Sequence, residues 1–181
     1  MKKGCEQVPG VTAEIFQVPE LLPTEVLAKM HAASFPYPII SAAKMTEADG
    51  FIFGIPTRYG RAVSSISSFF DSTGGLWASQ GLAGKFAATF FSTSSQGGGQ
   101  ETTSLTTIPF FAHQGMIFVP LGYGCKSLMD MSEIHGGSPY GAGTFSGGDG
   151  ARQPTELEKG VAVYQGKNFA GIVAQFDRGK Q

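Results

Sequence analysis

The sequence predicts an α/β fold that is built on a parallel sheet. Short apolar runs alternate along the chain with segments of helical pattern, which is the order expected of α/β layering. The clearest strand covers residues 52–55, an apolar run bounded by turn residues. Such a run is typical of a strand that is covered on both faces of a parallel sheet.

The first half of the chain contains two expected strands, over residues 13–18 and 50–55. Residues 23–30 are expected to form a short helix, because proline opens this segment and proline is favoured in a first helical turn. Two prolines within residues 32–46 indicate an irregular connection there. After the second strand, residues 63–71 are expected to form a helix.

The second half repeats the alternation. Residues 85–91 and 116–120 are expected to be strands, and residues 100–113 a helix between them. Pro109 lies inside this helical pattern, where it removes a backbone hydrogen bond and should kink the helix. A long helix over residues 154–176, again with proline at its start, closes the chain.

Residues 136–150 are too rich in glycine for a core element. They are either a flexible linker or a shaped functional loop. Flexible linkers tend to be rich in serine and charged residues, whereas Tyr140 and Phe145 can anchor this segment to the rest of the fold. We therefore favour an ordered loop.

Length and composition indicate a single domain over residues 1–181, in which 41% of the residues are hydrophobic and 15% are charged. A net charge of −1 gives no electrostatic case for binding nucleic acid or an acidic membrane. The apolar runs are far too short for an integral membrane segment. No signal peptide is visible, and Cys5 and Cys125 are most simply two reduced thiols, so we expect a cytoplasmic protein.

Two polar loops follow adjacent expected strands, and each loop has its own side-chain chemistry. In open α/β sheets, ligands bind just beyond the carboxyl ends of such strands, so two neighbouring loops there define one pocket. Backbone amides, an arginine and an aromatic ring suit a flat heterocycle with polar edges. The first loop contains Pro56, Thr57, Arg58, Tyr59 and Gly60, and the second contains Ser92, Thr93, Ser94, Ser95, Gln96, Gly97 and Gly98.

The sequence contains no motif of another common type of catalytic site. The chain has no nucleophile elbow, no Walker loop and no metal-ligand spacing among His31, His113 and His135, so no metal site is expected. Its carboxylates are scattered and form no convincing acid–base pair. We therefore expect a bound cofactor to carry the chemistry and the protein to position it.

A series of motifs resembles one family along most of the chain. They are Gly-Ile-Pro-Thr-Arg-Tyr-Gly (54–60), Thr-Gly-Gly-Leu-Trp-Ala (73–78), Gly-Gly-Gly-Gln-Glu (97–101), Ala-His-Gln-Gly-Met (112–116), Val-Pro-Leu-Gly-Tyr (119–123) and the glycine-rich run 136–150. In this order and spacing, the chain resembles the WrbA-type NAD(P)H:quinone oxidoreductases, which are flavodoxin-like FMN proteins. A lone glycine triplet would carry little weight, whereas the whole series is specific.

The resemblance implies a flavodoxin-like, doubly wound parallel sheet with helices on both faces. Family members begin with an apolar strand and a phosphate-binding loop. This sequence starts where the family is already near the end of its first helix. We therefore expect the first family strand, and the loop that follows it, to be missing.

The resemblance also implies FMN as cofactor and the two loops as its binding residues. Arg58 would face the pyrimidine edge of the flavin, where reduction builds negative charge, although a solvated surface arginine is the plain alternative. Tyr59 would either cover the ring or only cap the core. The second loop, residues 92–98, would face the ring and the ribityl chain, or it is simply a strand-to-helix turn.

Two further residues take roles from the resemblance. His113 matches a histidine beside the ring that helps to shape the nicotinamide and quinone site, and it is the candidate catalytic residue. A structural histidine near a helix end is its alternative. Trp77 would reach the active site of a neighbouring subunit as a wall for the substrate, or it is a core or interface anchor. This role predicts a homodimer or homotetramer.

Two functions follow from these observations. The first is an FMN-dependent NAD(P)H:quinone oxidoreductase that takes electrons from NADH or NADPH and reduces quinones to hydroquinones in two-electron steps, by a ping-pong mechanism. The second is a truncated, non-catalytic relative that keeps its subunit-association surfaces but binds FMN poorly.

Overall fold

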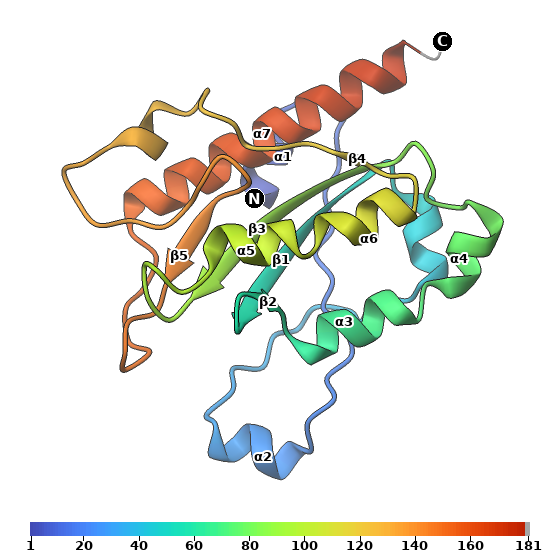
Figure 1. Cartoon of the computed structure of the whole chain (residues 1–181). Helices are drawn as coiled ribbons and strands as arrows, with labels where there is room; N and C mark the ends of the chain where they lie inside the picture. The colour runs from blue at the N-terminus through green and yellow to red at the C-terminus, as the bar shows by residue number, and fades with distance from the viewer. Residues whose placement is uncertain (180–181) are drawn as a thin grey trace.

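A parallel sheet forms the centre of the computed structural model, which describes residues 1–179 (Figure 1). β1 and β3 pair in parallel along most of their length. The other edge of β3 pairs with β4 near its start and with β5 near its end. β2 is antiparallel to the end of β1, so the order is β2-β1-β3-β4. The strands are β1 (Gly50–Arg58), β2 (Arg61–Ala62), β3 (Phe86–Thr93), β4 (Ile117–Phe118) and β5 (Gly143–Phe145).

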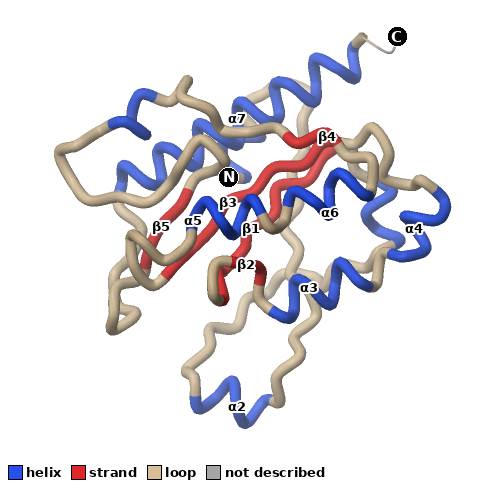
Figure 2. Tube along the Cα trace, viewed as in Figure 1, coloured by secondary structure: helices blue, strands red, loops and turns tan. Residues whose placement is uncertain are grey.

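Helices cover both faces of this sheet, as predicted (Figure 2). On one face Phe53 stacks on Phe111 and meets the ring of Phe70 edge-on, at 5.4 and 5.5 Å between centroids. On the other face Phe86 packs with Phe169 of the long C-terminal helix. The helices are α1 (Lys2–Cys5), α2 (Thr24–Lys29), α3 (Ser64–Asp71), α4 (Gly74–Ser79), α5 (Gln100–Leu105), α6 (Ile108–His113) and α7 (Glu156–Arg178), with 3₁₀ turns η1 (Ala43–Glu47) and η2 (Lys126–Met129).

The prediction of a strand over residues 13–18 is wrong. Only an isolated bridge forms there, between Gln17 and Ile39 in the returning part of the same connection. A strand of a sheet needs a partner strand, and residues 13–18 have only this bridge. Among the described residues, no strand pairs with the outer edge of β1 along residues 50–55.

The expected helix over residues 100–113 is interrupted. It forms two short helices, α5 and α6, and Pro109 lies in the first turn of α6 instead of kinking a continuous helix. This position costs no hydrogen bond, because the first N–H groups of a helix have no partner within it. The hydroxyls of Thr106 and Thr107 donate back to the carbonyls of Thr102 and Thr103 at the break, at 2.8 and 2.7 Å.

The glycine-rich segment 136–150 is ordered, as favoured above. It contributes β5 to the sheet and forms a bridge between Ser138 and Gly141. The single-domain prediction for residues 1–181 stays a prediction, and residues 180–181 lie outside the described chain. No helix within residues 1–179 combines the length and the apolar character needed to cross a membrane.

Candidate functional site

The two predicted loops lie side by side at the carboxyl ends of β1 and β3. Pro56 of β1 is in register with Ser92 of β3, and these residues open the two loops. The first loop continues into a tight hairpin with β2, which was not predicted from the sequence. Its two central residues, Tyr59 and Gly60, have positive φ angles of 55° and 75°, as in a type I′ turn.

Tyr59 is fully exposed at the tip of this hairpin. Its ring therefore does not cap the core, which removes one of the two interpretations left open above. A positive φ is costly for a residue with a large side chain, and such strain is concentrated at functional sites. The hairpin thus presents an aromatic ring to the outside at the carboxyl edge of the sheet.

Arg58 is exposed next to Tyr59. Within residues 1–179 its guanidinium forms no ion pair and no hydrogen bond. The group is therefore available to a ligand.

Helix α5 holds the two loops together. Thr103 donates a hydrogen bond from its hydroxyl to the hydroxyl of Thr57, at 2.8 Å. Gly60 and Gly99 touch through their backbones, since a Cβ on Gly99 would lie 2.8 Å from the Cα of Gly60. The two loops consequently form one continuous surface.

The second loop divides into an inward and an outward part. Ser94, Ser95, Gln96 and Gly97 are exposed, whereas Ser92 and Gly98 are half-buried. Thr93 is buried, and its hydroxyl donates to the carbonyl of Ser95 at 2.7 Å and accepts from Gln100 at 3.1 Å. Thr93 was predicted to face the cofactor. Its side chain instead points into the protein and supports the loop from inside.

A hollow of about 320 Å³ adjoins the second loop. One wall is the start of α5 with the residues before it, and the opposite wall is the segment from His135 to Ser138. Both ring nitrogens of His135 face backbone carbonyls, Nδ1 that of Gly136 at 2.8 Å and Nε2 that of Asp130 at 2.9 Å. The glycine-rich segment therefore shapes a wall of the candidate site.

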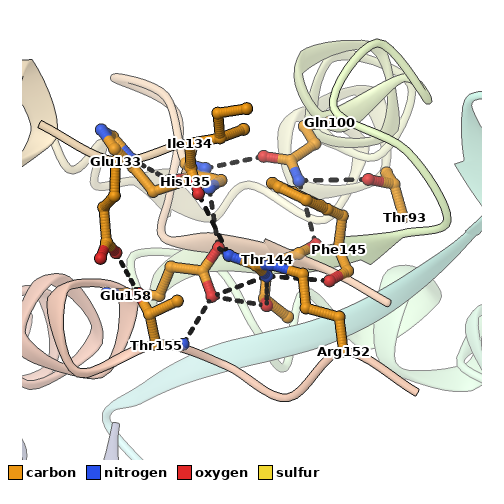
Figure 3. A network of polar contacts seen from close by, with 12 residues as sticks. Thr93, Gln100, Glu133, Ile134, His135, Thr144, Phe145, Arg152, Thr155 and Glu158 are labelled. Atoms are coloured by element: carbon orange, nitrogen blue, oxygen red, sulfur yellow. Dashed lines mark hydrogen bonds and ion pairs between the residues drawn. The ribbon is translucent and has the colours of Figure 1, made fainter. Parts of the chain in front are cut away.

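Gln100 and Glu158 hold that wall in place, a role that was not predicted for either residue from the sequence (Figure 3). Gln100 donates to the carbonyl of Thr144 at 3.0 Å and accepts from the N–H of Gly137 at 2.7 Å. Glu158 accepts from the N–H of Gly136 at 2.8 Å. One signal was visible: Glu158 follows Thr155 by three residues, the spacing of a helix capping box, which the structure contains.

Glu158 is the buried charge of this network, only 3% exposed. Its carboxylate pairs with Arg152 at 3.0 Å and accepts from Thr144 at 2.8 Å. Burial by itself raises the pKa of Glu158, but the hydrogen bonds from Arg152, Gly136, Thr144 and Thr155 outweigh it and lower the pKa below its usual value. The guanidinium of Arg152 also stacks on the ring of Phe145, 3.9 Å from its centre.

His113 and Trp77 lie at the opposite end of the sheet. A helix that follows a parallel strand must run back, so α6 ends beside the start of β3, where Gly84 donates to the carbonyl of Gly115. Trp77 belongs to the same end, because Gln114 donates at 2.9 Å to Thr73, which precedes α4. His113 is exposed and Trp77 is 55% exposed. One chain therefore does not bring these two residues to its own loops.

Residues 1–125 match the protein family described as NADPH-dependent FMN reductase. This match covers well over half of the chain. The chain belongs to the NADPH-dependent FMN reductase family. The candidate loops, α4 and His113 all lie inside the matched region.

Two similar proteins align with almost the whole chain. Quinone-oxidoreductase QR2 of Triphysaria versicolor is 53% identical over 174 residues, which are 95% of this chain and 85% of that protein. NAD(P)H quinone oxidoreductase PST3 of Candida albicans is 52% identical over 177 residues, which are 96% and 88%. These similarities confirm the resemblance to the WrbA-type NAD(P)H:quinone oxidoreductases.

A solved structure supports the fold of this FMN reductase family member. The flavodoxin, WrbA-like protein from Agrobacterium tumefaciens superposes with a TM-score of 0.58 at 20% sequence identity. The match covers 74% of this chain and 71% of that one. The flavodoxin-like fold class predicted from the sequence is thereby confirmed.

Proposed function

We propose that the chain is an FMN-dependent NAD(P)H:quinone oxidoreductase. The reaction takes NAD(P)H, a proton and a quinone to NAD(P)⁺ and a hydroquinone, with two electrons transferred. The observation that carries the proposal is the continuous surface of the two loops, with the free guanidinium of Arg58 and the exposed ring of Tyr59. Family membership and the names of the relatives support the same reaction.

The residues present fit a flavin mononucleotide. Arg58 has no partner among residues 1–179, and the outward part of the second loop offers exposed amides and hydroxyls. Bound FMN would supply the hydride acceptor and donor that the side chains lack. Arg58 would face its polar edge, Pro56, Thr57 and Gly60 would line that edge, and Tyr59 would cover the ring. The residues from Ser92 to Gly98 would border the flavin ring and its ribityl chain, and Thr93 would support this loop from inside.

A shared surface for the two substrates predicts ping-pong kinetics. NADH or NADPH would occupy the exposed face of the loops and leave before the quinone enters the same place. We place this reaction in the cytoplasm, which agrees with two free cysteines, Cys5 and Cys125.

The direct test uses the purified chain with added FMN. We expect an absorption band near ~450 nm that stays with the protein through gel filtration, as flavin chemistry dictates. Initial rates of NADH and NADPH oxidation, measured at several quinone concentrations, should give the parallel reciprocal plots of a ping-pong mechanism. Protein that elutes free of flavin and oxidises neither nucleotide would contradict the proposal.

We further propose that His113 and Trp77 complete the site of a second copy of the chain. Both side chains are exposed and lie at the opposite end of the sheet from the two loops of their own chain. They can therefore border only the loops of a neighbouring subunit. The proposed assembly is a homodimer or a homotetramer, in which Trp77 borders the quinone and His113 lies beside the ring.

Subunit mixing tests this arrangement. Trp77→Ala and Arg58→Ala variants should each lose most quinone reduction, and mixed oligomers of the two should regain part of it. In a mixed oligomer, some sites combine an intact Arg58 loop with an intact Trp77 from the neighbour. Light scattering should show the same oligomer for all samples. A stable monomer, or mixing without any regain, contradicts the shared site.

One observation favours the alternative of a non-catalytic relative. The outer edge of β1 has no partner strand along residues 50–55 in the described chain, directly below the first loop. A chain of this kind would associate through its subunit surfaces but hold FMN poorly. Formation of an oligomer without the ~450 nm band of bound flavin would select this alternative.

A further inference from the structure

Arg61 lies directly opposite Arg58 in the hairpin of β1 and β2. Opposed residues of an antiparallel pair project from the same face, with Cβ atoms about 4.5–5.5 Å apart. Both side chains are exposed, and Arg61, like Arg58, forms no ion pair or hydrogen bond with any described residue. The hairpin therefore carries two neighbouring positive charges that have no ion-pair partner among residues 1–179.

The hairpin backbone holds the Cα positions of the two arginines in place. Thr57 and Ala62, the next pair, face the other way, and Thr57 is bonded to Thr103 of α5. The tight turn between Arg58 and Arg61 leaves little freedom to the backbone. Like charges directly opposite each other destabilise a strand pair. A bound anion that lies between or above the two guanidinium groups would offset this repulsion.

A single cation is sufficient for the ring edge of a reduced flavin, which gains one negative charge. Arg58 already has this role in the proposed function. The second guanidinium, Arg61, points to a ligand that carries an additional anionic group. Guanidinium groups bind phosphate through two parallel N–H donors, more specifically than an ammonium does.

We propose that Arg61, with the field of Arg58 beside it, binds the phosphate monoester of a nucleotide at the candidate site. This inference rests on the proposed function, because it names the part of the ligand that the hairpin recognises. Two sources share the chemistry: the 5′-phosphate of FMN and the 2′-phosphate of NADPH. Riboflavin is FMN without the 5′-phosphate, and NADH is NADPH without the 2′-phosphate. Each phosphate source therefore has a matched ligand that lacks only the phosphate.

The test compares the ligand pairs on three proteins: the unchanged chain, Arg61→Ala and Arg178→Ala. Arg178 is an exposed arginine at the end of α7 and serves as the matched control. Affinities for FMN and riboflavin are measured by quenching of flavin fluorescence. Affinities for the oxidised nucleotides NADP⁺ and NAD⁺, which differ by the same 2′-phosphate as NADPH and NADH and cannot reduce the flavin, are measured by calorimetry on the FMN-loaded protein.

Arg61→Ala should weaken only the phosphate-bearing member of one pair. A lost charge-assisted hydrogen bond corresponds to roughly a tenfold to hundredfold loss of affinity. Loss for FMN but not riboflavin assigns the flavin phosphate, and loss for NADP⁺ but not NAD⁺ assigns the nicotinamide nucleotide's 2′-phosphate. Equal affinities in all three proteins, or equal loss for both members of each pair, overturn the proposal.

A second readout needs no flavin and separates this inference from the proposed function. Inorganic phosphate should raise the unfolding temperature of the unchanged chain and of Arg178→Ala above that in sodium chloride of equal ionic strength. It should not do so for Arg61→Ala. Without phosphate, Arg61→Ala should unfold at the same temperature or higher, because the opposed charges are gone. If the chain binds no flavin but shows this shift, the proposed function fails and the anion site stands; the same phosphate effect in all three proteins refutes the site.

Discussion

Replacing Gly99 with alanine should separate the two loops of the candidate site and remove flavin binding. The new Cβ would lie 2.8 Å from the Cα of Gly60 and 2.8 Å from the hydroxyl oxygen of Thr102. Gly99 also has a φ of 94°, a conformation that alanine adopts only at a cost of roughly 1–2 kcal/mol. The backbone contact cannot relax by a change of rotamer, so the hairpin must move away.

We expect Gly99→Ala to lower the free energy of unfolding by about 2–5 kcal/mol in urea titrations, the sum of strain and overpacking. Quinone reduction should fall on the order of a hundredfold, because a shift of about 1 Å in a positioning group has that effect. Gly148→Ala is the matched control, since a Cβ there meets open space and its φ is ordinary. If both variants behave alike, the contact between Gly60 and Gly99 does not hold the site together.

Replacing Glu158 with glutamine should release the glycine-rich wall and cause a large loss of stability. The carboxylate accepts hydrogen bonds from Gly136, Thr144 and Thr155 and pairs with Arg152, whereas an amide nitrogen in place of either oxygen would face N–H donors. Breaking a buried ion pair from one side typically costs about 3–5 kcal/mol. Glu156→Gln, in the same helical turn, removes only the exposed pair with Lys159 and should leave stability almost unchanged.

The stability that Glu158 provides should also depend on pH, in a direction that its pKa determines. Because folding lowers this pKa, the carboxylate stabilises the fold above the usual carboxyl range near pH 4. That contribution is lost as the pH falls through the lower pKa of the folded state. Urea midpoints measured from pH 7 down to pH 3 should therefore decrease less steeply for Glu158→Gln. Parallel pH profiles for the two proteins would contradict the assignment.

Several local features could be predicted because their signals are short in sequence. The apolar run at residues 52–55 and the alternation of strands and helices predicted a parallel sheet with loops at its carboxyl edge. Tyr140 and Phe145 predicted that the glycine-rich segment is ordered, and the stacking of Arg152 on Phe145 is part of the reason. Each of these inferences used residues that act within one element or directly next to it.

Other features depended on partners far away in the chain. Residues 13–18 have a strand-like pattern, but the pattern does not contain the neighbouring strand that would pair with them. Thr93 resembles its exposed serine neighbours in sequence, and only Gln100 and the turn at Ser95 decide that its hydroxyl points inward. The hairpin that sets Arg61 against Arg58 needs the left-handed Tyr59, a conformation that a tyrosine in sequence does not indicate.

The sequence by itself determined the fold class, the family and the loop chemistry of this protein, because these properties depend on local hydrophobic pattern and on motifs of neighbouring residues. The tertiary structure decided which of those motifs meet. It joined the two loops through Gly60, Gly99 and α5, and it placed His113 and Trp77 at the far end of the sheet. The physical reason is the direction of the chain. A helix that follows a parallel strand must run back to the end of the sheet where the strands begin, so motifs that are adjacent in sequence alternate between the two ends of the sheet.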